Sequence, residues 1–99
     1  MNLDTKYNIH KSMCESLNPL YVRKNTDYGD SVGKSIDDSG YMAVIIRMDD
    51  KMRRIKSLLN TTSVDEVMVK EESVEDTLLD LANYALILAT EVKIRSGKN

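Results

Sequence analysis

Three acidic side chains recur at every fourth position in the last third of the chain. Glu72, Asp76 and Asp80 share one side of a helix predicted over residues 71–94, and Asn83 extends the row. Like charges at this spacing destabilise an isolated helix by a few tenths of a kcal/mol per pair, roughly. Mg²⁺ takes oxygen ligands and usually binds one or two carboxylates together with substrate phosphates. The row therefore predicts a site for a divalent cation.

A second polar stripe lies on the helix predicted over residues 41–59. Arg47, Asp50, Lys51 and Arg54 follow i, i+3, i+4, i+7 spacing. If this helix is antiparallel to the helix over 71–94, Asp50 joins the acidic row as a metal ligand, and the basic side chains hold phosphate oxygens. A solvated helix surface produces the same spacing, so this interpretation stays open.

Residues 23–31 place charged side chains beside an aromatic ring and a glycine. We expect Lys24 to meet a phosphate and Tyr28 to stack on a base, with Asp27 beside them as a nucleotide contact. The alternative is an ordinary turn with Asp and Gly at its corners. A Gly-Lys-Ser sequence at residues 33–35 lacks the glycine spacing and the preceding strand of a phosphate-binding loop.

Hydrophobic periodicity indicates an all-α protein, a helical bundle of about three main helices. The first helix is predicted over residues 3–17, with a kink or an interruption at Asn18-Pro19. Residues 25–40 are rich in Asn, Asp, Ser and Gly and are predicted to form a loop. Residues 64–70 are ambiguous between an extended piece and a helical turn. The seam expected on the helix over 41–59 consists of Tyr41, Ile45, Met48, Met52, Ile55 and Leu59.

The 99 residues are predicted to form one domain with a modest core, and its apolar faces predict a homo-oligomer. The net charge of −2 argues against direct nucleic-acid binding. Neither a secretory signal nor a run of about 20 apolar residues is present, so we expect a cytoplasmic protein without membrane contact. Cys14, the only cysteine, and His10 are interpreted as helix-packing residues rather than reactive groups.

Three segments resemble the phage and bacterial nucleotide-modification-associated domain 1 proteins. They are YVRKNTDYGDS, IRMDDKMRRIKSLL and EESVEDTLLDLANYALI, in this order, and the resemblance covers residues from about 20 to 90. That family is more distantly similar to the all-α nucleoside triphosphate pyrophosphohydrolases of the MazG and dimeric dUTPase type. Those enzymes use a Glu-x-x-Glu helix and a Glu-x-x-Asp helix to bind Mg²⁺. This chain has Thr77 three residues before Asp80, and it lacks a Glu-x-x-Glu pair between residues 48 and 53.

The resemblance implies a nucleotide-handling protein of phage nucleotide metabolism or DNA modification. The leading hypothesis is a Mg²⁺-dependent nucleoside polyphosphate hydrolase, with Asp80, Asp76 and Glu72 as catalytic metal ligands. Asn83 and Tyr84 would contact the base or sugar. One alternative is an oligomer that sequesters a signalling nucleotide without cleaving it. The other is a structural interaction module.

Overall fold

The computed structural model describes residues 2–60 and 67–97, and over residues 67–73 it describes the path of the backbone alone. These residues form α1 (Leu3–Asp27), α2 (Ser31–Ser39), α3 (Met42–Asn60) and α4 (Val67–Arg95), and they include no strand. The all-α prediction is confirmed. The chain divides into two compact units, Met1–Ser31 and Val32–Asn99. Within the described residues, no helix is both long enough and apolar enough to cross a membrane.

The first unit is essentially one helix, α1. Its first turn is capped by Asn2, whose side-chain oxygen accepts a hydrogen bond from the Thr5 amide at 2.8 Å. The helix continues through Pro19 to Asp27, so the predicted end at residue 17 is wrong. A proline removes only one backbone donor, and helical turns on both sides hold the remaining bonds. Cys14 Sγ lies 3.7 Å from His10 Nδ1, and both side chains are exposed on α1.

A short turn separates α1 from α2. The Tyr28 amide donates to the Lys24 carbonyl at 3.0 Å, and Gly29 and Asp30 then adopt positive φ angles of 59° and 57°. Asp is one of the few side chains that tolerate this left-handed conformation. Residues 31–39 form α2, so the loop predicted over residues 25–40 is wrong for most of its length. The helix buries Gly33 and Ile36 and ends at Ser39, and the next residue, Gly40, has a positive φ angle of 75°.

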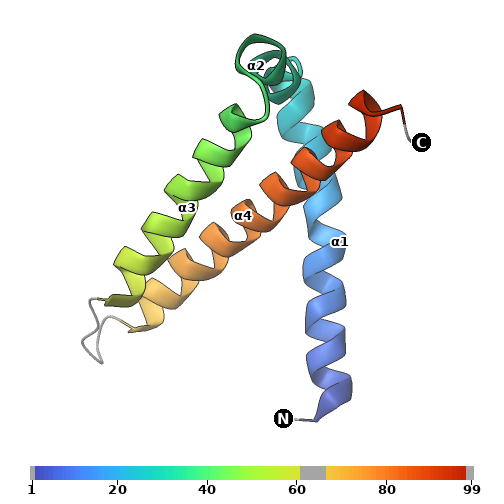
Figure 1. Cartoon of the computed structure of the whole chain (residues 1–99). Coiled ribbons are helices and arrows are strands. Elements are labelled where there is room, and N and C mark those ends of the chain that lie inside the picture. The colour runs from blue at the N-terminus through green and yellow to red at the C-terminus, as the bar shows by residue number, and fades with distance from the viewer. Residues whose placement is uncertain (1, 61–66, 98–99) are drawn as a thin grey trace. The chain divides into compact units, whose positions relative to one another are not determined.

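The second unit is organised by the packing of α3 against α4, which run side by side in opposite directions (Figure 1). The predicted helix over residues 41–59 is confirmed to within one residue at each end. The helix predicted over residues 71–94 begins four residues earlier, at Val67. Predicted features within residues 61–66, including the helix stop at Thr61-Thr62-Ser63, lie outside the described residues.

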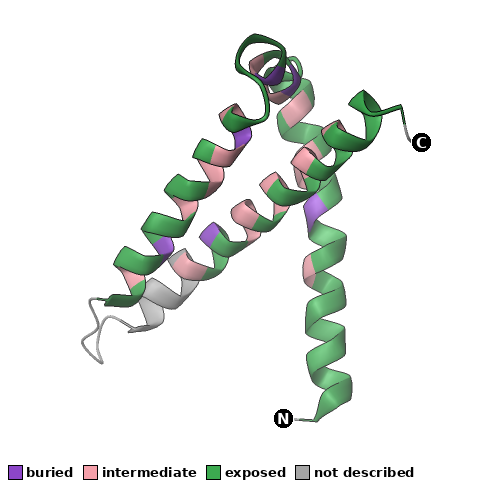
Figure 2. Ribbon diagram, viewed as in Figure 1, coloured by how far each residue is buried: buried purple, intermediate pink, exposed green. Residues whose placement is uncertain are grey.

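The buried side of α3 differs from the predicted seam. Val44 and Ile55 are buried, and the side chains of Arg47 and Lys51 are half-buried between them (Figure 2). Seam members Tyr41, Met52 and Leu59 are instead exposed, by 38%, 43% and 57%. Long basic side chains cover apolar surface with their methylene stems while the charged end stays accessible to water. The side of α3 that packs is therefore a mixed apolar and basic side.

Candidate functional site

Two cations of α3 lie one helical turn apart on its packed side. The Arg47 Nη2 atom donates to the Ser35 hydroxyl of α2 at 3.1 Å. The Lys51 Nζ atom lies 3.3 Å from Asp80 Oδ2 of α4, with the two side chains 30% and 34% exposed. α3 and α4 are antiparallel neighbours, which is the condition under which the two polar stripes were expected to meet. The structure thus brings Lys51 and Asp80 together, as predicted for a basic stripe that faces the acidic row.

The facing side of α4 supplies a row of polar side chains. Asp80, Asn83 and Tyr84 are half-buried, and Thr77, one turn earlier, is buried with 4% of its surface exposed. Because these positions are three or four residues apart, they share one side of the helix. The row combines a carboxylate, an amide and a phenol, which can together bind a cation and hydrogen-bond the polar edge of a base or a sugar.

Thr77 stands three residues before Asp80, where the predicted likeness to MazG-type enzymes expects a glutamate. Thr77 is the only buried polar or charged residue among those the structure describes. A glutamate at this position would place a carboxylate in a site closed to water, where a charge needs a partner and hydrogen bonds. A small hydroxyl side chain fits such a position better.

Arg47 and Lys51 differ in what neutralises them. Lys51 has a carboxylate partner, whereas the Arg47 guanidinium donates to a neutral hydroxyl. Among the described residues, no carboxylate oxygen lies within 4.0 Å of a nitrogen of Arg47. A half-buried guanidinium keeps donors that can hold a phosphate oxygen, and its planar shape suits bidentate contacts. Positive charge is therefore available on this side of α3.

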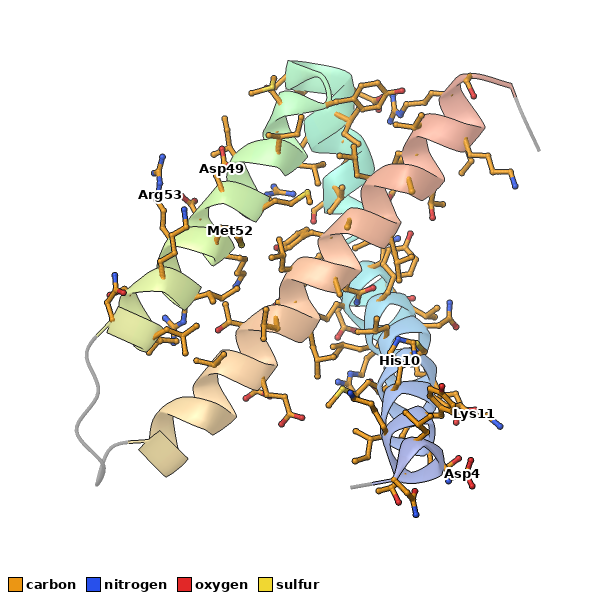
Figure 3. The ribbon with its side chains drawn as sticks, turned by 60° about the horizontal axis from the view of Figure 1, so that its bottom comes forward. Asp4, His10, Lys11, Asp49, Met52 and Arg53 are labelled. Atoms are coloured by element: carbon orange, nitrogen blue, oxygen red, sulfur yellow. The ribbon has the colours of Figure 1, made fainter. Side chains whose placement is uncertain are left out.

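The other two members of the predicted stripe on α3, Asp50 and Arg54, are exposed. The Asp50 carboxylate lies 3.9 Å from Arg53 Nη1, in a pair that is itself largely exposed. Figure 3 shows Arg53 and Asp49 projecting from the side of α3 that faces away from α4. The structure therefore does not bring Asp50 into the group formed by Lys51 and Asp80.

The predicted metal ligands are only partly gathered. Asp76 is exposed on α4, one turn before Asp80, and the side chain of Glu72 lies outside the described residues. Within the described part of the chain, no three His, Cys, Asp or Glu side chains cluster as a metal ion would need. The four-residue metal set of Asp50, Glu72, Asp76 and Asp80 stays a prediction.

The predicted phosphate and base contacts Lys24, Asp27 and Tyr28 belong to the first unit. Lys24 and Asp27 occupy the last turn of α1, and Tyr28 is its C-terminal cap with 70% of its surface exposed. All three are thus accessible to a ligand. Their role in nucleotide binding stays a prediction.

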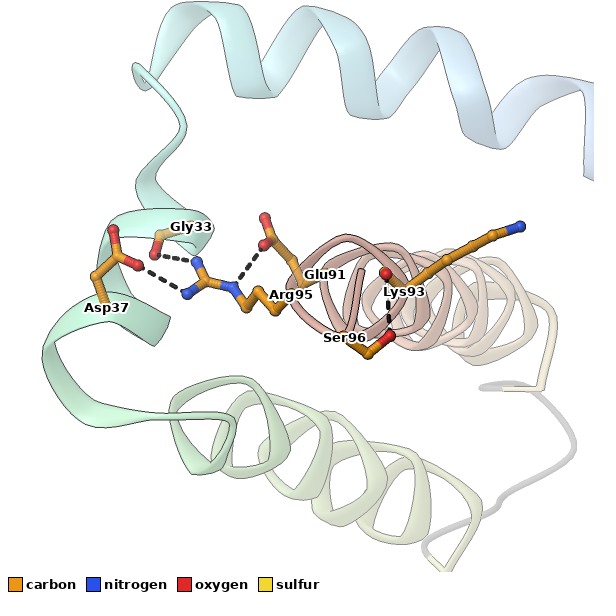
Figure 4. Close-up of polar contacts among 6 residues, drawn as sticks. All are labelled: Gly33, Asp37, Glu91, Lys93, Arg95 and Ser96. Atoms are coloured by element: carbon orange, nitrogen blue, oxygen red, sulfur yellow. Dashed lines mark hydrogen bonds and ion pairs between the residues drawn. The ribbon is translucent and has the colours of Figure 1, made fainter. Parts of the chain in front are cut away.

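An arginine that was not predicted joins the end of α4 to α2 (Figure 4). Arg95 donates from Nη1 to Asp37 Oδ1 at 2.8 Å, from Nε to Glu91 Oε2 at 2.9 Å and from Nη2 to the Gly33 carbonyl at 3.1 Å. The hydrogen bond to Asp37, followed by that to Glu91, raises the pKa of Arg95. The i, i+4 spacing of Glu91 and Arg95 was visible in the sequence. Asp37 was missed because its segment was predicted to be a loop.

The family of this chain follows from its similarity to known proteins. The model of the family named nucleotide modification associated domain 1 matches residues 24–91, which is more than half of the chain. The chain belongs to this family. The match includes the site on α3 and α4 and confirms the resemblance seen in the sequence. No curated protein and no solved structure matches the chain. The likeness to MazG-type enzymes stays a prediction.

Proposed function

We propose that this member of the nucleotide modification associated domain 1 family binds a nucleoside polyphosphate along the packed sides of α3 and α4. The proposal rests on one observation. Two half-buried cations of α3, Arg47 and Lys51, lie one turn apart at the contact with the polar row of α4. Arg47 would hold phosphate oxygens with its free donors, and Lys51 would add a second positive charge. Asn83 and Tyr84 would contact the sugar or base.

The donor set on α4 fits Mg²⁺ as the ion that accompanies a nucleotide. Asp76 and Asp80 are one turn apart, and a nucleotide-bound Mg²⁺ needs only one or two protein carboxylates. When bound, the ion would neutralise phosphate charge and polarise a phosphoryl oxygen. Lys51 would then leave Asp80 and turn to the phosphates. Glu72 is a further candidate for this ion.

Hydrolysis of the bound nucleotide is a further step of the proposed function. Asp80 is its central residue, because its carboxylate is half-buried at the contact between α3 and α4. Asp80→Asn keeps the size of the side chain but removes its charge, so metal-dependent turnover or binding should be lost while the helical circular dichroism is kept. Undiminished activity in this variant would exclude the assignment.

Binding without cleavage is the second candidate function, and the Lys51–Asp80 ion pair favours it. The carboxylate that hydrolysis would need for a metal is neutralised by the chain's own lysine at 3.3 Å. A protein of this kind would sequester a nucleotide through its cations. Binding that persists in EDTA, with the nucleotide recovered unchanged, would support sequestration against hydrolysis.

A thermal-shift screen tests the proposal. The common ribo- and deoxyribonucleoside mono-, di- and triphosphates are each added with Mg²⁺ or with EDTA, and those that raise the melting temperature are incubated and chromatographed. A ligand at 100 times its dissociation constant stabilises the folded state by about 2.7 kcal/mol. No shift with any of these nucleotides would contradict the proposal and favour a structural interaction module.

A further inference from the structure

One side of α4 is apolar and exposed along four turns. We define the outer face of α4 as Leu78, Ala82, Ala85, Leu86, Ala89 and Val92, all of which are exposed. The three large members retain 47%, 54% and 42% of their surface at Leu78, Leu86 and Val92. Their spacing of three or four residues keeps them on one side of the helix. That side is opposite the one that holds Thr77.

The outer face of α4 is distinguished from the exposed apolar residues of α3 by its continuity. On α3, Ile46 and Met52 are exposed, but Asp49 and Arg53 interrupt them (Figure 3). Between Leu78 and Val92, no charged residue interrupts the outer face of α4. A continuous apolar patch of this kind marks an interaction surface.

The core of a single chain gives a reason for a partner. Within the described residues, only four hydrophobic side chains are buried: Leu17, Ile36, Val44 and Ile55. The second unit, Val32–Asn99, is below about 80 residues, a size at which a small core is commonly supplemented by oligomerisation, a metal or disulfides. The chain has a single cysteine, so an intrachain disulfide is excluded. A second copy of the chain can supply the missing buried surface.

We propose that the outer face of α4 binds the same face of a second copy in an antiparallel helix pair. The charges at its ends select this partner and this direction. Glu75 and Asp76 stand exposed at the start of the face, and Lys93 stands exposed at its end. An antiparallel pair brings the acidic start of each helix to the basic end of the other. A parallel pair would bring like charges together.

One register satisfies the apolar and the charged residues together. With the two-fold axis midway between Ala82 and Leu86, Leu86 of one copy faces Ala82 of the other, and Leu78 lies level with Thr90, next to Ala89. Leu86 thus meets a small side chain, which lets the two helices approach closely at the axis. The same register sets Glu75 opposite Lys93 at both ends. The pairing repeats itself by symmetry, as a closed two-fold dimer requires.

Mass measurement by light scattering after gel filtration tests the interface. We expect the intact chain to elute with about twice its mass of 11.2 kDa. Leu86→Glu should halve this mass, because it places two carboxylates in the apolar contact, while the helical circular dichroism is retained. Ile46→Glu on α3 is the matched control and should stay dimeric. A single-chain mass for the intact protein, or an unchanged mass for Leu86→Glu, would overturn the proposal.

Charge exchange and cross-linking test the direction. Glu75→Lys alone and Lys93→Glu alone should each weaken the dimer, and the double variant should restore it. In a Cys14→Ser background, a mixture of Glu75→Cys and Lys93→Cys chains should oxidise chiefly to the mixed disulfide. Disulfides chiefly between identical chains would overturn the antiparallel register. These tests involve neither Arg47 nor Lys51, so their failure is separable from failure of nucleotide binding.

Discussion

Lys51 of α3 and Asp80 of α4 form an ion pair at 3.3 Å across the contact that organises the second unit of this protein. The pair lies beside Arg47, whose guanidinium is held by a hydroxyl. Acidic and basic side chains predicted separately from two segments thus meet at one place. In the proposed function, this ion pair is the feature that a nucleotide and its metal ion would rearrange.

The Lys51–Asp80 pair should contribute little to folding. Both side chains are about one third exposed, and ion pairs near the surface contribute about 0–1 kcal/mol. We expect Lys51→Gln to change the free energy of unfolding by less than about 1 kcal/mol, as measured by urea denaturation at fixed protein concentration. The exposed Lys56→Gln is the control for loss of a charge on the same helix. A much larger loss for Lys51 alone would assign the pair a structural role.

Val44 should matter most to the stability of the α3 packing. Its side chain has no exposed surface. Val44→Ala removes two methyl groups and leaves a cavity, so we expect a loss of about 2 kcal/mol in the free energy of unfolding. The control is Val22→Ala on α1, where half of the side chain is exposed. Similar losses for the two variants would mean that Val44 is not a core residue.

Thr77 should not accept the glutamate of the MazG pattern. Thr77→Glu would bury a carboxylate, and we expect a loss of at least about 2 kcal/mol. Thr77→Ser, which removes one methyl group, should cost about 1 kcal/mol. Thermal melts of the two variants provide the comparison. A stable Thr77→Glu protein would show that this position can turn toward solvent and a metal ion.

Arg95 should hold α2 to the end of α4 through the shape of its guanidinium. It donates to three acceptors in different directions, which a lysine ammonium on a single stem cannot reproduce. We expect Arg95→Lys to lower the melting temperature more than Lys56→Arg does. The folded state raises the pKa of Arg95. Its contribution to folding stability is therefore complete at any pH below the pKa of Arg95 in the unfolded chain, and it is lost only when a strongly alkaline pH passes the folded-state pKa. Titration of Arg95 should therefore not reduce the melting-temperature difference between the parent protein and Arg95→Lys from pH 6 to pH 9.

The fold was predictable where the sequence is periodic over many turns. The predictions of α3 and α4 were confirmed, because helical spacing of apolar residues that continues over 19 and 29 residues is a strong signal. The segment of α2 was predicted wrongly because its composition resembles a loop, whereas in the structure it is a helix that buries Gly33 and Ile36. The continuation of α1 past Pro19 was missed because a single lost hydrogen bond does not end a long helix.

The candidate site was predictable in its residue types more than in its contacts. The pairing of a basic side of α3 with an acidic row on α4 follows from spacing and antiparallel packing, and Lys51 and Asp80 confirm it. Which side of α3 packs was not predictable from hydrophobicity, because the aliphatic stems of Arg47 and Lys51 replace Met52 and Tyr41 in the contact. Ser35 and Asp37 could not be assigned until α2 was known to be a helix.

The most direct test of the central proposal compares two arginines of α3. Arg47 lies on the packed side, whereas Arg53 is 80% exposed on the other, so Arg47→Gln and Arg53→Gln remove the same charge from the same helix. Calorimetric titration with nucleoside triphosphates and Mg²⁺ measures the dissociation constant for each. We expect at least a roughly 10-fold weaker affinity for Arg47→Gln, from loss of a charge-assisted hydrogen bond, and less than about a twofold change for Arg53→Gln. Equal losses in the two variants, or no binding by the parent protein, would contradict phosphate recognition by the packed side of α3.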